Sequence, residues 1–558
     1  MLRLCRIEDC RRALNSQQFR RSINSNSPSN PAQTFATSWQ RPCGEYTGIS
    51  IYNHRVRGKV PLILRNPHMV TWYTCGPTVY DKTHVGHAST YVKVDIIQRI
   101  MRDYFKYNLI TAMNVTDVDD KIIRRSKETK RNWQELARDY DAEFKEDMLR
   151  LNVKPPNMRA HVSTNISVIL RFIEKLVKNQ QAYVAEDKSV YFDIAKCPNY
   201  GKLENISNVE RDLQENEQGK RNAADFALWK AKKTEDEPSW KTKWGGDGRP
   251  GWHIECSAIA SMFFGEELDF HAGGLDLRFP HHENEEAQCC ARYKTNQWVN
   301  YWLHTGQLHL VGNQQKMSKS LGNIITVDEM LKSYTADEFR MACLLSNYNN
   351  AMIYSDQLML TARQTLNKFR NFHADLNAYM QFKKAPKLLD KGALQAQLNH
   401  MVMEFDNSLR DDFDTSRAVG VLMDQMSSIS RCINEQADAE QEPGYCLDLL
   451  LAAGNFIGTS MINFGISSLT DKSIEKSQQQ NANSSAKVDI NLLVADLLAV
   501  RSQLREQAVK SSDTKRNELL ELCDKLRNLL QQHGIYVRDH KQGSSWVYSD
   551  QKSVIRRM

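Results

Sequence analysis

The chain has 558 residues, of which 41% are hydrophobic and 25% are charged, the composition of an ordinary globular protein with room for about two to four domains. No apolar run approaches the roughly eighteen residues of a membrane-spanning helix, so no membrane partner is expected. The 74 lysines and arginines outnumber the 67 acidic residues, a mild excess that permits an anionic partner such as RNA without requiring one.

The first forty residues differ from the rest of the chain. Their arginines are opposed only by Glu8 and Asp9, serine, asparagine and glutamine fill the spaces, and no apolar core of a secretory signal is present. An arginine-rich, acid-poor leader is typical of a mitochondrial transit peptide, so residues 1–40 are predicted to direct the protein to the mitochondrial matrix. A basic tail that binds RNA is the alternative interpretation.

A strand, a turn and a helix follow. Residues 69–73 are an apolar run that predicts a buried strand, and residues 91–104 repeat apolar side chains at helical spacing. Between them the segment CGPTVYDKTHVGH occupies positions 75–87, where an open α/β sheet places its ligand. Small residues let an anionic ligand approach the backbone, and His84 and His87 can donate hydrogen bonds to phosphate oxygens. Taken alone, the segment could equally be a turn with two surface histidines.

Residues 109–115 predict a second buried strand, which ends at the acidic segment TDVDDK of residues 116–121. Strand, helix and strand at this spacing form a βαβ unit, which favours a parallel sheet. Helical periodicity then extends over about residues 132–181, followed by a hairpin-like piece at 182–194 and a polar stretch up to residue 220. The segment from about 132 to 220 is therefore expected to be an insertion between the two halves of the sheet.

Cysteine, histidine and glutamate side chains gather further along the chain. A glycine-rich loop at 245–251 leads into a predicted helix whose first turns hold Trp252, His253 and Cys256, and residues 268–274 predict a strand. The next helix opens with PHHENEE, in which two successive histidines each have a glutamate four residues later, on the same helix face.

These residue types are ligands of zinc, which binds thiolate, imidazole and carboxylate groups. Cys75 and Cys256, with one histidine and one glutamate, would complete a four-ligand site. The pair His281 and Glu285 qualifies, and so does the pair one residue later along the chain; the two point about 100° apart, so only one can face a given metal. Spacing alone leaves this choice open, and two buried cysteines beside a charged helix terminus are the alternative.

A short downstream loop, KMSKS at residues 316–320, carries two lysines and two serines. Lysine ammonium groups on such a loop can neutralise the charge that moves onto leaving pyrophosphate, while the hydroxyls hold the loop. By itself, a run of this kind is more often a solvated basic loop.

Together these segments resemble the cysteinyl-tRNA synthetase family of class I aminoacyl-tRNA synthetases. HVGH at 84–87 and KMSKS are similar to the paired signatures of class I enzymes, with Val85 in place of an isoleucine. The segments CGPTVYD, TDVDDK, GWHIEC and FPHHENE are similar to those of the family itself, and the similarity runs from about Tyr46 into the C-terminal region. With the arginine-rich leader, the mitochondrial members are the most similar.

The resemblance implies a set of functional residues. One zinc ion per chain would be held by Cys75, Cys256, His281 and Glu285. ATP, as a substrate with Mg²⁺, would bind to His84, Gly86, His87, Lys316, Ser318 and Lys319, with the two histidines and two lysines as catalytic residues. The residues expected to bind the amino-acid substrate are Cys75, Gly76, Thr78, Trp252 and His253.

The implied activity is ligation of L-cysteine to tRNA(Cys) through a cysteinyl-adenylate, for mitochondrial translation. A zinc ion that binds the substrate as thiolate would separate cysteine from serine without an editing domain. Two other classes of protein could share the sequence features of this catalytic domain. An ATP-dependent ligase that joins cysteine to a small amine would lack the long helical C-terminal part, and a non-catalytic RNA-binding protein would be expected to lose some of the motif residues.

The resemblance also implies the fold class, which is α/β: a Rossmann-type parallel-sheet catalytic domain with an insertion, followed by an α-helical bundle. Helical periodicity beyond residue 324 agrees with this. The expected divisions are a transit peptide at 1–40, a catalytic domain at 41–330, stem-contact helices at 331–390, an anticodon-binding domain at 391–466, a flexible linker at 467–486 and a C-terminal tRNA-binding segment at 487–558.

Overall fold

The computed structural model describes residues 39–204, 219–310, 313–316, 324–383, 390–434, 445–467, 490–511, 513–540 and 543–548. The predicted transit peptide and the predicted linker at 467–486 lie almost wholly outside these ranges, so both stay predictions. Among the helices that the structure describes, none has the length and apolar character needed to cross a bilayer.

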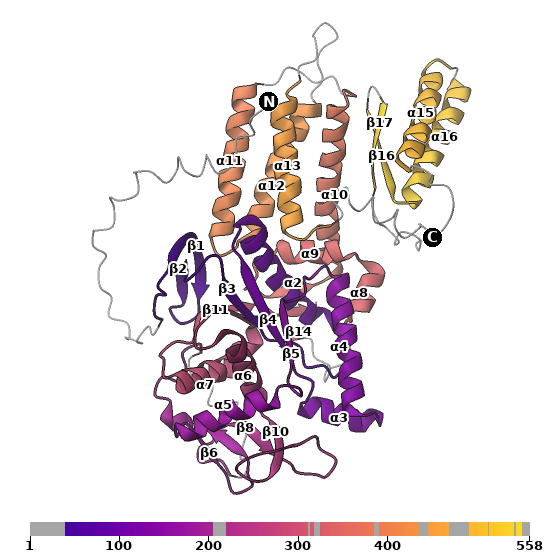
Figure 1. Cartoon of the computed structure of the whole chain (residues 1–558). Coiled ribbons are helices and arrows are strands. Elements are labelled where there is room, and N and C mark those ends of the chain that lie inside the picture. Colours follow the sequence, from indigo (N-terminus) through magenta and orange to yellow (C-terminus); the bar gives the residue numbers. More distant parts are fainter. Residues whose placement is uncertain are drawn as a thin grey trace, which may run out of the picture. The chain divides into compact units, whose positions relative to one another are not determined.

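Five parallel strands form the centre of the catalytic region, in the order β12–β11–β3–β4–β5 (Figure 1). Their bounds are β3 (Val70–Thr74), β4 (Leu109–Val115), β5 (Met158–His161), β11 (Leu268–Gly274) and β12 (Val299–Thr305). β3 and β11 are neighbours in the sheet although they are far apart in the sequence. The direction in which the chain adds strands therefore reverses between them, and ligands of open α/β sheets bind outside the carboxyl ends of strands at such a point. The predicted α/β fold with a parallel sheet is confirmed.

Apolar side chains on both faces of this sheet explain why its strands read as continuous apolar runs. Every residue of β3 is buried, and the ring of Trp72 stacks on Phe270 of β11 with ring centroids 4.7 Å apart. The helix α2 (Val85–Arg99) covers one face and continues into a π-helical turn, Ile100–Tyr104. Burying each large apolar side chain stabilises the fold by about 1.5–3 kcal/mol, so this layer anchors the loops at its edge.

The stretch from 132 to 181, expected to be helical throughout, holds two helices with a strand between them. These helices are α4 (Trp133–Arg150) and α5 (Ile166–Lys178), and β5 lies between them and pairs in parallel with β4. The expectation of continuous helical periodicity was therefore wrong at β5. A strand of four residues is too short to show a period of its own, and Pro155 and Pro156, which precede it, favour extended backbone.

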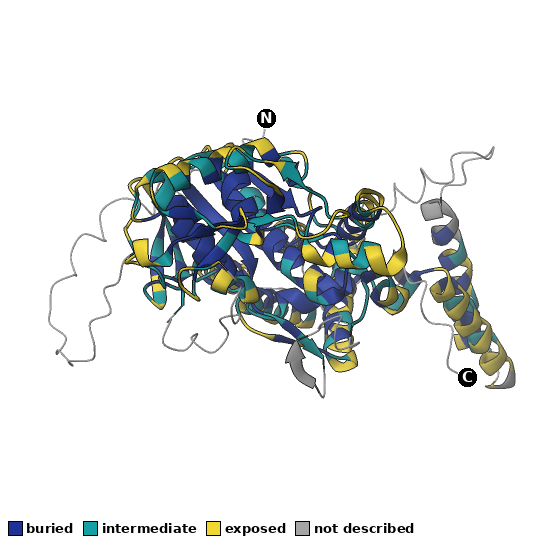
Figure 2. Ribbon diagram, turned by 90° about the horizontal axis from the view of Figure 1, so that it is seen from below, coloured by how far each residue is buried: buried dark blue, intermediate teal, exposed yellow. Residues whose placement is uncertain are grey.

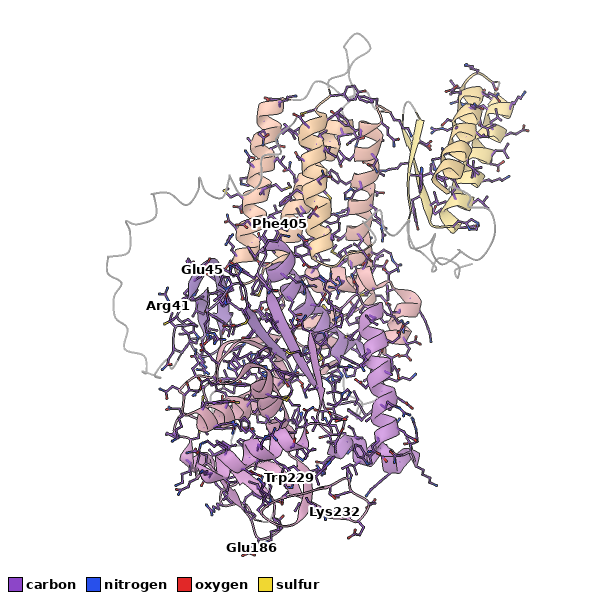
Figure 3. The ribbon with its side chains drawn as sticks, viewed as in Figure 1. Arg41, Glu45, Glu186, Trp229, Lys232 and Phe405 are labelled. Carbon is purple, nitrogen blue, oxygen red and sulfur yellow. The ribbon has the colours of Figure 1, made fainter. Side chains whose placement is uncertain are left out.

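A second sheet, antiparallel, lies beside the central one in the order β6–β7–β8–β10–β9. The predicted hairpin is confirmed as β6 and β7, and Trp229 of β8, labelled in Figure 3, is completely buried. The glycine-rich segment expected to be a loop contains the short strand β10. The bounds are β6 (Ala182–Val184), β7 (Val190–Phe192), β8 (Phe226–Ala231), β9 (Trp240–Lys241), β10 (Asp247–Pro250), α6 (Trp252–Phe264) and α7 (Glu283–Tyr293).

Helices predominate after residue 326, as predicted. They are α8 (Val327–Ser333), α9 (Ala336–Leu344), α10 (Asp356–Met380), α11 (Lys391–Arg410), α12 (Thr415–Asn434), α13 (Leu447–Asn463), α15 (Ile490–Val509) and α16 (Asp513–Gln532). Phe405 of α11, labelled in Figure 3, is fully buried in the core of these helices. Figure 2 shows buried residues concentrated around the central sheet, whereas most of the described residues of α16 are exposed.

The remaining elements are short. They are β1 (Glu45–Asn53), β2 (Gly58–Leu64), α3 (Asp120–Thr129), β13 (Leu308–Leu310), β14 (Asn313–Lys316), β15 (Met352–Tyr354), β16 (Ile535–His540) and β17 (Gly543–Tyr548).

Candidate active site at the carboxyl edge of the parallel sheet

Three predicted substrate-binding residues lie directly after β3. The backbone N–H of Cys75 donates to Ala272 O in β11 at 3.2 Å, and Thr78 forms a parallel bridge with Thr116 at the end of β4. Between them, Gly76 donates its N–H to the side chain of Asn114 at 2.7 Å. A Cβ on Gly76 would lie 1.7 Å from the carbonyl oxygen of Asn114, so only glycine fits this close approach.

The two histidines predicted to bind ATP mark the start of α2. His84 is its N-cap, since Nδ1 of the ring accepts a hydrogen bond from His87 N at 3.3 Å, and the two rings stack with centroids 4.0 Å apart. His84 is buried and His87 is exposed. Val85 is completely buried and donates its N–H to Ile325 O, so an apolar residue fits this position of the motif.

The lysine- and serine-containing loop is only partly described. Lys316 ends β14, which pairs with β13, and Ser318 and Lys319 lie outside the described residues. Just after the loop, Val327 donates its N–H to Thr83 O at 3.0 Å, and Thr326 forms a bridge with His84. The chain that follows the loop is therefore held against the histidine motif.

The four predicted zinc ligands come together from three separate segments. The sulfur of Cys75 lies 3.5 Å from the sulfur of Cys256 and 3.5 Å from Oε1 of Glu285, and Nε2 of His281 lies 3.2 Å from the same oxygen. One potential ligand atom from each of the four residues lies within 4.8 Å of the others, and all four residues are buried.

A second, overlapping group was not foreseen from the sequence. It consists of Cys75, Glu285, His271 and His282, and one potential ligand atom from each residue lies within 4.8 Å of the others. Nε2 of His271 is 2.9 Å from Oε2 of Glu285, and Nε2 of His282 is 3.4 Å from the sulfur of Cys75. The position of His271 near the carboxyl end of a predicted strand was the signal that could have indicated it.

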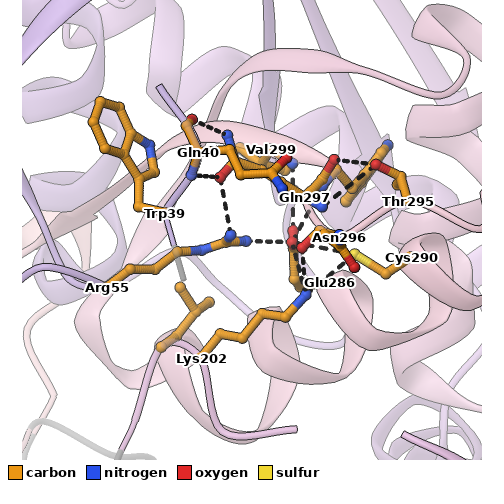
Figure 4. A network of polar contacts seen from close by, with 12 residues as sticks. Trp39, Gln40, Arg55, Lys202, Glu286, Cys290, Thr295, Asn296, Gln297 and Val299 are labelled. Atoms are coloured by element: carbon orange, nitrogen blue, oxygen red, sulfur yellow. Dashed lines mark hydrogen bonds and ion pairs between the residues drawn. The ribbon is translucent and has the colours of Figure 1, made fainter. Parts of the chain in front are cut away.

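Glu286, the other glutamate of the two pairs, serves a different purpose (Figure 4). Its buried carboxylate forms an ion pair with Arg55 and accepts backbone N–H groups from Trp298 at 3.2 Å and Val299 at 3.3 Å, and Lys202 Nζ lies 3.7 Å away. Burial alone would raise the pKa of Glu286, but Arg55 and Lys202 hold it below its usual value. Glu286 therefore ties α7 to β12 and to the turn after β1, which leaves Glu285 facing the cysteines.

Among the described residues, no lysine or arginine forms an ion pair with Glu285 in the cluster around Cys75. Burial raises the pKa of Cys75 well above its usual range and that of Cys256 to about 11, and it also raises the pKa of Glu285. Within the described ranges, the ion pairs of Glu285 are to His271 and His281, with no lysine or arginine. A divalent cation would favour the deprotonated thiols, so these residues fit a zinc ion.

The predicted substrate residues Trp252 and His253 border this cluster. The indole of Trp252, which is 39% exposed, stacks on the ring of His281 with centroids 4.3 Å apart. Nδ1 of His253 lies 3.1 Å from Nδ1 of His281, and burial together with the charge of Lys230 lowers the pKa of His253 to about 3, so its ring is neutral near pH 7. The side chain of Trp252 therefore lies at the edge of the cluster that is exposed to solvent.

Comparisons with known proteins agree on one family. A family model described as the class I (C) tRNA synthetase catalytic domain matches residues 63–364. A probable mitochondrial cysteine–tRNA ligase of Xenopus tropicalis is 41% identical over 541 residues, which cover 93% of this chain and 92% of the relative. A cytoplasmic cysteine–tRNA ligase of Dictyostelium discoideum is 36% identical over 543 residues, covering 92% and 80%.

A solved structure shows the likeness of fold. The crystal structure of Mycobacterium tuberculosis methionyl-tRNA synthetase bound by methionyl-adenylate has a TM-score of 0.57 to this chain at 13% sequence identity. The similar region covers 72% of this chain and 92% of that one.

Proposed function

The chain belongs to the cysteine–tRNA ligase family of class I tRNA synthetases and is a ligase enzyme, and we propose that it joins L-cysteine to tRNA(Cys) through a cysteinyl-adenylate in the mitochondrial matrix. The observation that carries this proposal is the buried group of Cys75, Cys256, His281 and Glu285, in which Cys75 belongs to the same chain segment as the histidine motif.

The proposed zinc site distinguishes cysteine from serine. Zinc held by those four residues supplies a soft cation with preference for a thiolate sulfur over a hydroxyl oxygen. Trp252, the exposed edge of the cluster, would cover the bound amino acid, and the close approach of Gly76 to Asn114 fixes the end of β3 beside it. Since an apolar pocket alone discriminates poorly between such similar substrates, this selectivity removes the need for a second, hydrolytic site.

For the first step, we place ATP with Mg²⁺ over the start of α2. His84 and His87 would donate hydrogen bonds to phosphate oxygens, and the small Gly86 lets the ligand approach the helix N-terminus. Lys316, Ser318 and Lys319 would close on the phosphates as the cysteine carboxylate attacks the α-phosphorus and pyrophosphate leaves. The backbone contacts that hold Thr326 and Val327 beside the histidine motif support this arrangement. No protein nucleophile is required, because positioning and charge stabilisation carry such a transfer.

In the second step the acyl group would pass to the terminal ribose of tRNA(Cys). We assign tRNA binding to the helical regions, with stem contacts at 331–390, the anticodon at 391–466 and further contacts at 487–558. The similarity to cysteine–tRNA ligases over more than nine-tenths of the chain supports a tRNA substrate rather than a small amine.

The mitochondrial location rests mainly on the arginine-rich leader at residues 1–40. One relative is named as probably mitochondrial and another as cytoplasmic, so the names of relatives alone do not decide the compartment.

The test is ATP–pyrophosphate exchange by protein without the leader, with cysteine or serine, before and after chelation of zinc. We expect exchange with cysteine only, lost on chelation and restored by zinc. Equal exchange with serine, or activity that survives complete removal of zinc, would contradict the proposed metal site.

A further inference from the structure

The short helix α3 has an exposed, basic surface. Only Ile122 among its ten residues is buried. The side chain of Arg124 is 72% exposed, that of Lys127 is 50% exposed, and Lys130, at the C-cap, is also exposed. Three further cations in or directly after the helix are Lys121, Arg125 and Arg131.

Residues 119–131 hold six lysines and arginines against three acidic residues, so cations are in excess around α3. Asp119 is engaged as the N-cap, accepting the N–H of Lys121, and Asp120 already pairs with Lys230 of β8 and with Arg249 of β10. Two pairs on the outer face, Glu128 with Arg124 at 3.9 Å and Asp236 with Lys127 at 2.8 Å, are exposed on both sides. Exposed pairs of this kind contribute about 0–1 kcal/mol, so a phosphate can replace the carboxylate at small cost.

The basic helix starts next to the candidate active site. Thr116, which precedes it, is held to the substrate-binding segment by two backbone hydrogen bonds, from Thr116 N to Pro77 O and from Val79 N to Thr116 O, each 3.1 Å. The ammonium of Lys121 lies 5.7 Å above the ring centroid of Tyr80 in that same segment. Proteins that bind single-stranded nucleic acids combine cations with aromatic rings in this way.

The surface is also fixed in position. Asp120 joins the first turn of α3 to β8 and β10 through its ion pairs with Lys230 and Arg249. Figure 1 shows α3 between α4 and the antiparallel strands. Ten helical residues extend about 15 Å, so the cations form a track that leads away from the edge of the sheet.

We propose that α3 and the turn after it bind the phosphates of the unpaired 3′ strand of tRNA and guide its terminal ribose to the site beside Cys75. This inference rests on the proposed function, because it requires an RNA whose 3′ end reacts at this edge. Phosphate contacts of this kind supply affinity and orientation without reading sequence.

The test removes three cations that the structure places on the outside of α3. The variant Arg124→Gln/Lys127→Gln/Lys130→Gln is compared with Arg171→Gln/Lys175→Gln/Lys178→Gln, which removes three exposed cations from α5. We expect the α3 variant to bind a tRNA(Cys) transcript roughly 10- to 100-fold more weakly and the logarithmic salt dependence of binding to fall by about 2, at about 0.7 per lost contact. The α5 variant should bind like the parent protein.

A transcript without its unpaired 3′ nucleotides identifies the part of the RNA involved. The α3 variant and the parent protein should bind this shortened RNA equally. If the α3 variant binds both transcripts more weakly than the parent protein by the same factor, α3 contacts another part of tRNA. The assignment to the 3′ strand is then wrong. An unchanged affinity and salt dependence would refute an RNA-binding role for α3 altogether.

ATP–pyrophosphate exchange without tRNA separates this inference from the proposed function. The α3 variant should keep exchange within about twofold of the parent protein, because no adenylation residue is altered. Absence of cysteine-dependent exchange in the parent protein would instead refute the proposed function, whatever the RNA-binding results.

Discussion

Replacing Arg55 by methionine should destabilise the protein strongly, because the buried carboxylate of Glu286 loses its ion pair with Arg55. The side chains of Arg55 and Glu286 are 2% and 0% exposed, and the remaining cation, Lys202, is 3.7 Å away (Figure 4). Breaking a buried ion pair by removing one partner costs about 3–5 kcal/mol. We expect a loss at the lower end of this range, since two backbone N–H groups still contact the carboxylate. Urea denaturation followed by tryptophan fluorescence measures it.

The double variant Arg55→Met/Glu286→Gln provides the control. It removes both charges, so it should recover a large part of the stability lost in the single variant. Lys59→Met is the comparison for an exposed pair, since Lys59 and Asp411 are each 46% exposed, and it should change stability by less than about 1 kcal/mol. If Arg55→Met costs no more than Lys59→Met, Glu286 is not held as the structure indicates, and the reason for assigning Glu285 to the metal is lost.

Three further predictions concern the site and the pH dependence of stability. Gly76→Ala should abolish pyrophosphate exchange, because its Cβ would lie 1.7 Å from Asn114 O; exchange near the parent rate would refute this packing. Cys256→Ser should lower the zinc content measured by atomic absorption at least tenfold, whereas Cys290→Ser should retain one ion per chain. Burial raises the pKa of Asp412 to about 6 from 3.8, so the folded state binds its proton more tightly and this contribution to stability, up to about 3 kcal/mol, is lost as pH rises from 4 through 6. Asp412→Asn should flatten the unfolding free energy over that interval, and an unchanged slope would contradict the assignment.

The sequence predicted three of the five strands of the central sheet: β3 and β4 are apolar runs, and β11 ends in a glycine turn. It did not predict β12. It failed at β5, where four residues after two prolines carry no period. The helical character of the C-terminal part was predicted correctly, since amphipathic repeats extend over many residues there. The domain divisions stay predictions.

The local sequence pattern could not decide which of the two histidine–glutamate pairs faces the cysteines. Both glutamates lie on the same helix, and what distinguishes them is Arg55, which is 231 positions away in the sequence and reaches Glu286 only in the folded chain. The resemblance to a known family gave the pair that faces the cysteines, but spacing could not. His271 was missed for a similar reason, because its proximity to Glu285 depends on how β11 packs against α7.

The position of Cys75 links recognition of the amino acid to binding of the nucleotide. Cys75 and His84 belong to one segment, which is fixed at its start by the contact of Gly76 with Asn114 and at its end by the contact of Val85 with Ile325. A substrate side chain bound at the metal site that Cys75 lines would therefore be held at a set separation from the start of α2. Because reacting groups must be about 3–3.5 Å apart for efficient transfer, an amino acid that cannot bind through sulfur would be misplaced relative to the α-phosphate as well as weakly bound. In the proposed mechanism, selectivity for cysteine thus arises in the reaction step as well as in binding.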